Sequence, residues 1–490
     1  MPHRRARLTA STVQGTLAAA LAGLRTQLQL PDGFPPEVIA EADAAVAAPP
    51  QLDLRGIPFV TLDPAGSRDL DQAMQLERLG SGWRVRYAIA DVPGFVAPNG
   101  AMDAEARRRG ETLYAADGAI PLHPTTISEG KASLLPGVDR PAFVWTFDLD
   151  DRGAELAHRV ERAWVRSRAQ LDYVSTQAAL ERNNSDSPAA LLPEIGRARL
   201  EQERLRGGAS LNLADEEIVR DAAGGYVVER RRPLPLEDWN AQLSLMTGMA
   251  AATLMLDAGI GILRTMPAAD DAAQSAFRVR TVALGLPWPS GMPYGQFLRG
   301  LDRDDPQTLA VLQAAVSLFR GAGYVAFDGA PPPNPMQAAV AAPYAHVTAP
   351  LRRLVDRWGL VVCAAVSAGA AVPDWVRQSL PGVPALMHAG IERESRLSAG
   401  SIERVEAAML RDRVGQQLTA WVLEVRDGKA RVQLTDPIVT ASCHVPDSVL
   451  AGQTIDVRVV RADIPTGVVQ LEPADAPDSA SADAPGRAPV

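Results

Sequence analysis

Residues 59–72 read Phe-Val-Thr-Leu-Asp-Pro-Ala-Gly-Ser-Arg-Asp-Leu-Asp-Gln, and this stretch decides the fold. It places three carboxylates, Asp63, Asp69 and Asp71, within nine residues. The apolar approach from Ile57 to Leu62 predicts a buried strand, and the Pro-Ala-Gly-Ser that follows Asp63 predicts a turn. A strand that delivers one acid into a turn carrying two more forms an oxygen-rich pocket. Mg²⁺ and Mn²⁺ prefer such a pocket. The alternative is a solvated acidic turn at the surface.

The spacing of these acids resembles a known signature. Thr61-Leu-Asp63 followed by Ser67-Arg-Asp-Leu-Asp71 is similar to the pattern of the ribonuclease II family (the RNB catalytic domain), whose members remove nucleotides from RNA 3′ ends. The family pattern ends in two consecutive acids, whereas this chain has Gln72 in the last position. Many relatives carry cold-shock-type barrels before the catalytic domain, and about 50 residues leave no room for one. We therefore expect a short form without them.

The resemblance continues in order from about residue 53 to 370. Tyr87–Val92 resembles the strand after the acidic loop, Arg109–Tyr114 the next family block, and Ser167–Tyr173 a later one. In the family, these last two blocks each present a tyrosine to RNA, which implies RNA-binding roles for Tyr114 and Tyr173. The alternative for each is a core aromatic ring with its hydroxyl in water.

A second signature lies in Tyr344–Asp356, which resembles the family's Thr-Ser-Pro-Ile-Arg-Arg-Tyr-x-Asp. Pro350 fits the first turn of a helix, where the helix dipole favours anions. Two arginines there predict a phosphate clamp, in which Arg352 neutralises phosphoryl oxygens. Arg353 is the weaker candidate for RNA contact and can act structurally through Asp356. A plain surface arginine pair is the alternative.

A second position departs from the family. The predicted helix 237–258 resembles a family helix that presents a glutamate to the ribose, and Gln242 stands in that place. A glutamine can still hydrogen-bond a 2′-hydroxyl, the group that separates RNA from DNA. We therefore expect Gln242 to bind RNA.

The resemblance also implies the chemistry. Two divalent ions about 3.5–4 Å apart can activate water and stabilise a leaving alkoxide. The expected metal is Mg²⁺, with Mn²⁺ as the alternative, and the expected ligands are Asp63, Asp69, Asp71 and Gln72. Asp69, Asp71 and Arg352 are the expected catalytic residues. Because a glutamine supplies no negative charge, Gln72 predicts a greater demand for metal or, in the extreme, an inactive RNA-binding relative.

Bulk properties narrow the class of protein. The chain has 490 residues, 47% of them apolar and 22% charged, and a net charge of −9. This describes a globular protein of two to four domains whose RNA path is a local basic channel. No apolar run is long enough to span a bilayer. Cys363 and Cys443 are the only cysteines, and we expect buried free thiols in a reducing cytoplasm.

The expected fold is α+β: a mixed α/β RNB catalytic domain with a small helical N-terminal module and a C-terminal five-stranded OB-type β-barrel. The module covers 1–50 and contains two helices, either a helix-turn-helix-like unit or a packing cap. The catalytic domain covers 51–405. Five short strands in 412–475 predict the RNA-binding barrel. Residues 476–490, rich in Ala, Pro, Asp and Ser, predict a disordered tail.

The leading functional prediction is a 3′→5′ hydrolytic exoribonuclease acting on single-stranded RNA and releasing nucleoside 5′-monophosphates; direction and product come from the resemblance. The family precedent implies a monomer. An RNA-binding relative with weak or lost catalysis is the first alternative, supported by Gln72. A phosphatase using Asp69 and Asp71 as nucleophile and acid is the second, and the arginine signature argues against it.

Overall fold

The computed structural model describes residues 5–7, 11–115, 118–182, 186–209, 215–220, 226–231, 233–302 and 306–474. None of the helices in these ranges combines the length and apolarity that crossing a membrane would require. The predicted tail 476–490 lies outside the described residues.

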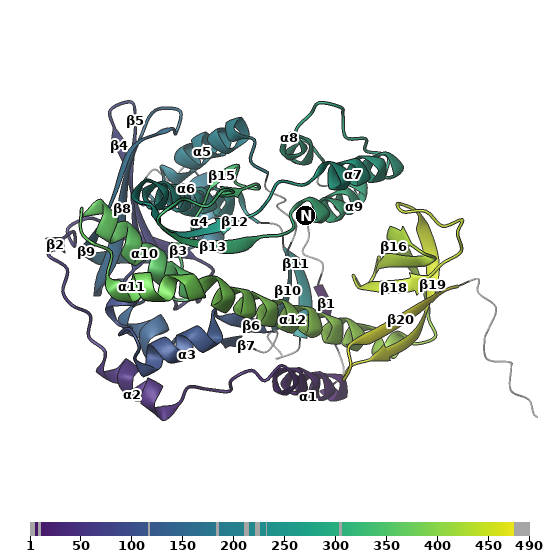
Figure 1. Ribbon diagram of the computed structural model, residues 1–490. Coiled ribbons are helices and arrows are strands. Elements are labelled where there is room, and N and C mark those ends of the chain that lie inside the picture. The colour runs from purple at the N-terminus through teal and green to yellow at the C-terminus, as the bar shows by residue number, and fades with distance from the viewer. Residues whose placement is uncertain are drawn as a thin grey trace, which may run out of the picture.

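Two helices precede the catalytic region, α1 (Ser11–Gln27) and α2 (Pro36–Ala44). They pack on different elements: α1 lies along α12 (Val383–Leu410), and α2 lies on α3 (Ala101–Arg109) (Figure 1). In the first contact, Leu17 and Leu21 share a buried cluster with Val405. Each helix thus packs on another part of the chain, and the choice between a packing cap and a helix-turn-helix-like unit stays a prediction.

A rolled six-stranded sheet forms the body of the catalytic region, in the order β2-β9-β3-β4-β5-β8 with β9 also pairing β8. Its strands are β2 (Leu52–Asp53), β3 (Phe59–Asp63), β4 (Gln72–Leu79), β5 (Gly82–Ala90), β8 (Asp139–Leu149) and β9 (Glu155–Asp172). The 18-residue β9 closes the roll. Its first part pairs antiparallel with β8, and its last six residues run parallel to β3.

The predicted buried strand is β3, and both of its faces are covered. Val60 and Leu62 belong to the large core under α6 (Pro235–Ala258) and α10 (Leu354–Ser367), whereas Phe59 points into a second core shared with α2 and α3. A strand covered on both faces reads as a continuous apolar run, which explains the sequence before Asp63. Asp63 ends the strand, where the burial stops.

Further helices and hairpins complete this region. The helices are α4 (Tyr173–Glu181), α5 (Leu192–Arg206) and α11 (Asp374–Ser379). The short strand pairs are β6 (Leu113–Ala115) with β7 (Gly118–Ile120), β12 (Ile260–Thr265) with β13 (Gly323–Asp328), and β14 (Met336–Gln337) with β15 (Ala342–Pro343). The predicted hairpin near 214–230 is β10 (Asp215–Arg220) with β11 (Tyr226–Arg231), to which β1 (Arg5–Arg7) adds a third strand.

Three short helices form a separate cluster beside the barrel: α7 (Asp271–Ala283), α8 (Tyr294–Arg299) and α9 (Pro306–Ala315) (Figure 1). Phe277, Trp288 and Phe297 make its aromatic core, with ring centroids 5.7–6.2 Å apart. Leu423 of the barrel joins the same core, so this cluster links the two large parts of the molecule.

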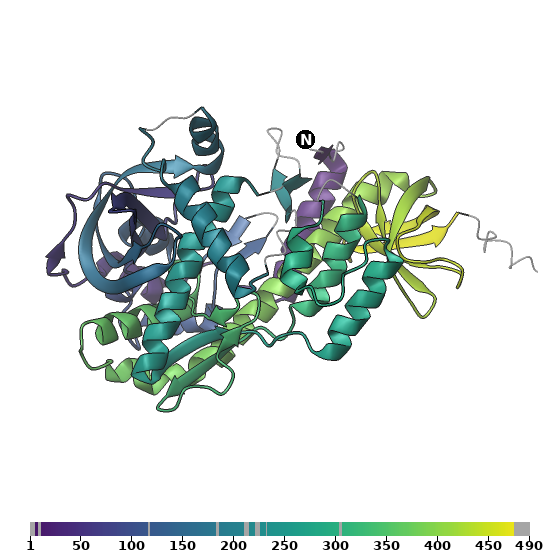
Figure 2. The same ribbon diagram turned by 90° about the horizontal axis from the view of Figure 1, so that it is seen from above.

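The five predicted C-terminal strands close into a barrel in the order β16-β17-β18-β20-β19, which confirms the prediction. They are β16 (Gln417–Arg426), β17 (Lys429–Leu434), β18 (Thr440–His444), β19 (Thr454–Asp463) and β20 (Val468–Pro473). The 28-residue α12 runs from the catalytic region to this barrel, and the barrel stands at one end of the molecule in both views (Figures 1 and 2).

Candidate active site

The acidic loop after β3 is held in place by hydrogen bonds to the backbone of residues 68–71. Ser133 donates its hydroxyl to Arg68 O at 2.6 Å and accepts the Leu70 N–H at 3.0 Å. The Asp71 carbonyl accepts the Ala90 N–H of β5 at 2.9 Å. These bonds fix the backbone on both sides of Asp69 and at Asp71.

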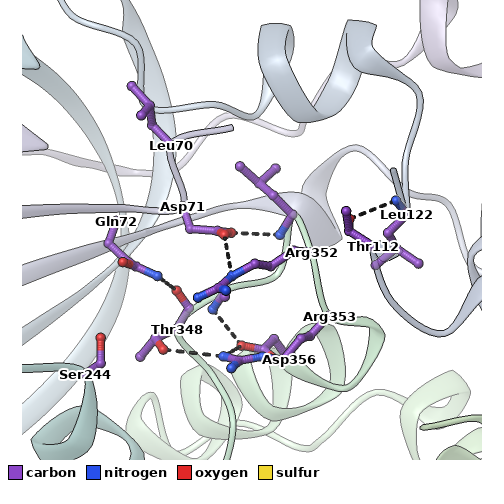
Figure 3. Close-up of polar contacts among 12 residues, drawn as sticks. Leu70, Asp71, Gln72, Thr112, Leu122, Ser244, Thr348, Arg352, Arg353 and Asp356 are labelled. Atoms are coloured by element: carbon purple, nitrogen blue, oxygen red, sulfur yellow. Dashed lines mark hydrogen bonds and ion pairs between the residues drawn. The ribbon is translucent and has the colours of Figure 1, made fainter. Parts of the chain in front are cut away.

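Asp71 connects the two sequence signatures, which are 280 residues apart. The residue is only 4% exposed. The Leu351 N–H donates to Asp71 Oδ1 at 2.8 Å, and Arg352 Nε lies 3.8 Å from Oδ2 (Figure 3). Burial raises the pKa of the Asp71 carboxyl well above its ordinary value, and the Arg352 guanidinium and the Leu351 N–H oppose this rise. Asp71 therefore orients the arginine that the second signature supplies.

Asp63 and Asp69 form a second acidic unit. Burial, and then the charge of Asp69, raise the pKa of the Asp63 carboxyl to about 7, while Arg352 lowers it. Two carboxylates that repel each other in a partly dry pocket are stabilised by a cation between them. Mg²⁺ commonly binds through one or two carboxylates and completes its shell with water and substrate phosphates. The chemistry of this pair fits that mode.

Gln72 points elsewhere. Its side-chain amide donates to the Thr348 carbonyl oxygen of the arginine loop (Figure 3). Only the N–H₂ end can face a carbonyl, because two acceptor oxygens repel. Within the ranges that the structure describes, no three His, Cys, Asp or Glu side chains form a group able to hold a metal ion. The structure thus brings Asp63 and Asp69 together, ties Asp71 to Arg352, and uses Gln72 to join the two loops; the four-ligand set stays a prediction.

The prediction that Pro350 and both arginines open a helix is wrong. Helix α10 starts at Leu354, and Arg353 is its N-cap residue with extended φ and ψ of −128° and 127°. The Arg352 carbonyl accepts the Thr112 N–H at 2.9 Å, and Leu354 N–H donates to Gly110 O at 3.0 Å. Residues 350–352 form a single turn, in which the Ala349 carbonyl accepts the Arg352 and Arg353 N–H groups at 3.2 and 2.9 Å. Pairing with residues 110–112 then holds Arg353 extended, so tertiary contacts delay the start of the helix.

Arg353 and Asp356 form a buried clamp behind Arg352. The guanidinium donates to both carboxylate oxygens at 2.8 and 2.9 Å, and Asp356 also accepts the Ala349 N–H at 2.6 Å. Asp356 is fully buried, and the Arg353 side chain is 19% exposed. Arg352 is instead 48% exposed. The two arginines therefore have different roles: Arg353 holds the loop through Asp356, and the half-exposed Arg352 faces Asp71.

The predicted tyrosines flank the acids. Tyr114, on β6, is 49% exposed; burial raises the pKa of its phenol, and the Arg352 guanidinium opposes this rise. Tyr173 starts α4, and its hydroxyl accepts from Asn240 Nδ2 at 3.0 Å. Burial raises the pKa of Tyr173 to about 12, and Asn240 lowers it. Tyr114 thus offers a free ring beside Arg352, whereas Tyr173 is held by α6.

Gln242 does not reach this site. It is 3% exposed, and its amide donates to Glu203 Oε2 of α5 at 2.7 Å. Asn240 and Ser244, on the other face of α6, contact the tyrosines beside the acids: Asn240 bonds to Tyr173, and Ser244 lies 2.9 Å from the Tyr87 hydroxyl. Burial raises the pKa of the Tyr87 phenol above its ordinary value, and the charges of Asp63 and Asp71 add to this rise. Sequence reasoning missed Asn240 and Ser244. Their four-residue spacing on one helix face is the signal that could have found them.

Comparisons with known proteins identify the family of the chain. The RNB domain model matches residues 51–362, and the model of the RNase II-type exonuclease C-terminal S1 domain matches 416–474. Escherichia coli ribonuclease R is 29% identical over 348 residues, 66% of this chain and 40% of that protein. The chain thus spans well under two thirds of this curated relative.

Two solved structures share the fold. Mycoplasma genitalium RNase R in its apo form has a TM-score of 0.85 and 16% identity, covering 94% of this chain and 78% of that one. Yeast Ssd1, described as a pseudonuclease, has a TM-score of 0.70 and 14% identity, covering 87% and 55%. With the RNB model matching more than half of its residues, the chain belongs to the RNB family, the exoribonuclease family of ribonucleases II and R, with that family's C-terminal S1 domain.

Proposed function

We propose that this chain is a metal-dependent exoribonuclease that shortens single-stranded RNA from its 3′ end and releases nucleoside 5′-monophosphates. The observation that carries the proposal is the meeting of the two loops at Asp71. The buried carboxylate holds the Leu351 N–H and faces the Arg352 guanidinium. A half-exposed arginine oriented by a buried acid, next to a repelling acid pair, suits the handling of a phosphodiester.

Each residue has a distinct task in this proposal. Arg352 pairs with the non-bridging oxygens of the scissile phosphate, where negative charge grows as water attacks. Asp71 holds Arg352 in place and keeps it from swinging into solvent. Asp63 and Asp69 would hold the divalent cation on which the family depends, and the bound cation supplies a water of lowered pKa together with charge for the leaving oxygen.

Tyr114 supplies the position of the RNA end. Its half-exposed ring stands beside Arg352, so a base stacked on it leaves the adjoining phosphate within reach of the guanidinium. Tyr173 and Asn240 form a polar pair that can meet ribose hydroxyls on the opposite side. Solved structures of Mycoplasma genitalium RNase R hold single-stranded and double-stranded RNA, which supports RNA as the substrate class.

A second candidate function, RNA binding without catalysis, is favoured by Gln72. Its amide joins the two loops through Thr348, and the family pattern has an acid in this place. The fold alone does not decide between the two, because Ssd1 shares it. Retention of Asp63, Asp69, Asp71 and Arg352 favours the enzyme.

The test uses a 5′-labelled single-stranded oligoribonucleotide incubated with the purified chain and Mg²⁺, Mn²⁺ or EDTA. Asp71→Asn is the test variant, since asparagine keeps an oxygen for the Leu351 N–H but loses the charge facing Arg352. Asp257→Asn, at an exposed position near the end of α6, is the matched control. We expect a metal-dependent ladder that shortens from the 3′ end, absent in Asp71→Asn and present in Asp257→Asn. RNA that is bound and left intact under every metal condition would instead establish the binding function.

A further inference from the structure

A cavity of about 380 Å³ lies between α5, α6 and the segment around β14, on the far side of α6 from the acids. Its walls are largely apolar, with Leu245, Met266, Phe319 and Val340 among them. Figure 1 shows α5 and α6 side by side, and the two helices pack against each other. A volume of this size matches a small-molecule pocket that encloses one ligand.

The cavity and the candidate active site use opposite faces of α6. Asn240 and Ser244 contact Tyr173 and Tyr87 on the catalytic side. Leu245 lines the cavity, and Gln242 bonds to Glu203 of its wall. Successive helical residues are 100° apart, so positions 242 and 240 point about 200° from each other. The cavity is therefore a separate site.

One cavity residue carries unused hydrogen-bond donors. Arg206 is the last residue of α5, and its Nε and Nη2 atoms are buried without a hydrogen-bond partner in the part of the chain that the structure describes. These two atoms form one edge of the guanidinium, whose parallel N–H groups match two oxygens of a phosphate or carboxylate. An unpaired buried donor destabilises the folded chain. A ligand oxyanion would satisfy both at once.

The remaining walls narrow the choice of ligand. Glu203, whose carboxylate accepts the Gln242 amide, is an acceptor suited to hydroxyl or amino groups of a ligand. Because it repels negative charge, the ligand's oxyanion faces Arg206 and not Glu203. Phe319 and Met266 offer apolar surface for a flat ring. A small molecule that combines one oxyanion, several donors and a ring meets all three features.

We propose that this cavity binds a nucleoside 5′-monophosphate, with the phosphate on the Arg206 edge, the ribose or base donors toward Glu203, and the base against Phe319 and Met266. The proposal rests on the proposed function in one respect, because an exoribonuclease of this kind produces that ligand. The site then senses the product of the catalytic site across α6.

Binding is measured by isothermal titration calorimetry on the full chain in EDTA, with AMP, adenosine and inorganic phosphate as separate probes. The test variants are Arg206→Met, which removes the edge, and Ala339→Phe, which fills the cavity. Arg204→Met is the matched control, since Arg204 lies two residues away and pairs with exposed Glu201 at 2.6 Å. Arg352→Met reports binding at the catalytic site.

We expect AMP to bind, with at least tenfold weaker affinity in Arg206→Met and Ala339→Phe and unchanged affinity in Arg204→Met and Arg352→Met. Adenosine and phosphate alone should each bind at least tenfold more weakly than AMP. Without ligand, Arg206→Met loses the unpaired donors but also the positive charge near buried Glu203, so its thermal melt is measured alongside. A variant that is folded at the temperature of the titration shows that lost binding is not lost folding.

Three outcomes would overturn the proposal: no binding of AMP, binding lost in Arg352→Met but kept in Arg206→Met, or phosphate binding as tightly as AMP. Because the titration needs no catalysis, failure of the exoribonuclease test leaves this measurement intact. An inactive chain that binds AMP through Arg206 keeps the site and loses only the origin of its ligand.

Discussion

The clamp of Arg353 and Asp356 allows a worked prediction for Asp356→Asn. The Asp356 carboxylate is fully buried and receives three N–H donors, two from Arg353 and one from Ala349. Asparagine keeps an oxygen for the Ala349 N–H, so the main change is the lost charge opposite Arg353. Removing one partner of a buried ion pair lowers the free energy of unfolding by about 3–5 kcal/mol.

The same change should reach the catalytic residue. Arg352 adjoins the clamp, and its carbonyl and side chain are placed by Thr112 N–H and Asp71. When the loop loosens, Arg352 is no longer held beside Asp71, so RNA cleavage should fall by at least tenfold at temperatures where the variant is still folded.

Urea unfolding of Asp356→Asn, Arg353→Met and the double variant measures the clamp as a double-mutant cycle. We expect the double variant to lose about 2–3 kcal/mol less than the sum of the single losses, because neither charge is then left unpaired. A loss below 1 kcal/mol in Asp356→Asn, or strict additivity, would refute the reasoning that the pair is a buried, coupled unit.

Three further predictions follow from single positions. Gln72→Asp loses the bond to Thr348 but restores the family's fourth acid. Because the added carboxylate binds the cation more tightly, the metal concentration for half-maximal cleavage should fall about tenfold. Gln72→Asn is the control, and an unchanged metal titration in Gln72→Asp contradicts a ligand role. Burial and Glu394 raise the pKa of Glu111 to about 7, above its unfolded value, so this carboxyl destabilises the folded chain progressively as pH rises from about 4.5 through 7. At pH 8, Glu111→Gln should therefore have a free energy of unfolding about 1–2 kcal/mol higher than that of the unchanged chain, after allowance for solvent screening. At pH 4 the two should unfold with the same free energy. The same gain at both pH values would exclude titration of Glu111 as the cause. Gly248→Ala places a Cβ 2.1 Å from Tyr344 Cε2 and 2.6 Å from Ala345 O, so it should lower the unfolding free energy by about 1–3 kcal/mol in a thermal melt, whereas Gly323→Ala, with no atom within 4 Å, should not.

Much of the fold was predictable because local signals and tertiary packing agree. The apolar run before Asp63 is a strand covered on both faces, and the five C-terminal strands with turns such as Asp427-Gly428 close into a barrel. Where the local signal and the tertiary packing disagree, the prediction from the sequence was wrong. Pro350 signals a helix start, but residues 110–112, about 240 positions away in the sequence, pair with residues 352–354 and delay it.

The candidate site was predictable only in part, for a related reason. The short motifs locate Asp71 and Arg352, and the structure brings the two together. The rotation of α6 about its axis decides which side chains meet the sheet. The four-residue spacing of Asn240 and Ser244 puts these two on one face, but it does not by itself say that this face is the catalytic one. Gln242 therefore turned toward α5, and Asn240 and Ser244 took the catalytic side. The direction of Gln72 likewise depends on a carbonyl from another signature.

The long helix α12 also fixes the separation between two parts of the molecule. Its 28 residues span about 42 Å, and along that length it contacts β6, which carries Tyr114, and β19 and β20 of the barrel. Leu113 of β6 shares a buried cluster with Leu397 in the middle of α12, and Gly467 of the barrel lies against Glu403 and Arg404, so only a short middle part of the helix separates the two contacts. Each residue inserted into the helix would move the barrel outward by about 1.5 Å and rotate it by about 100°. This middle part of the helix thus fixes how far apart β6 and the barrel are held.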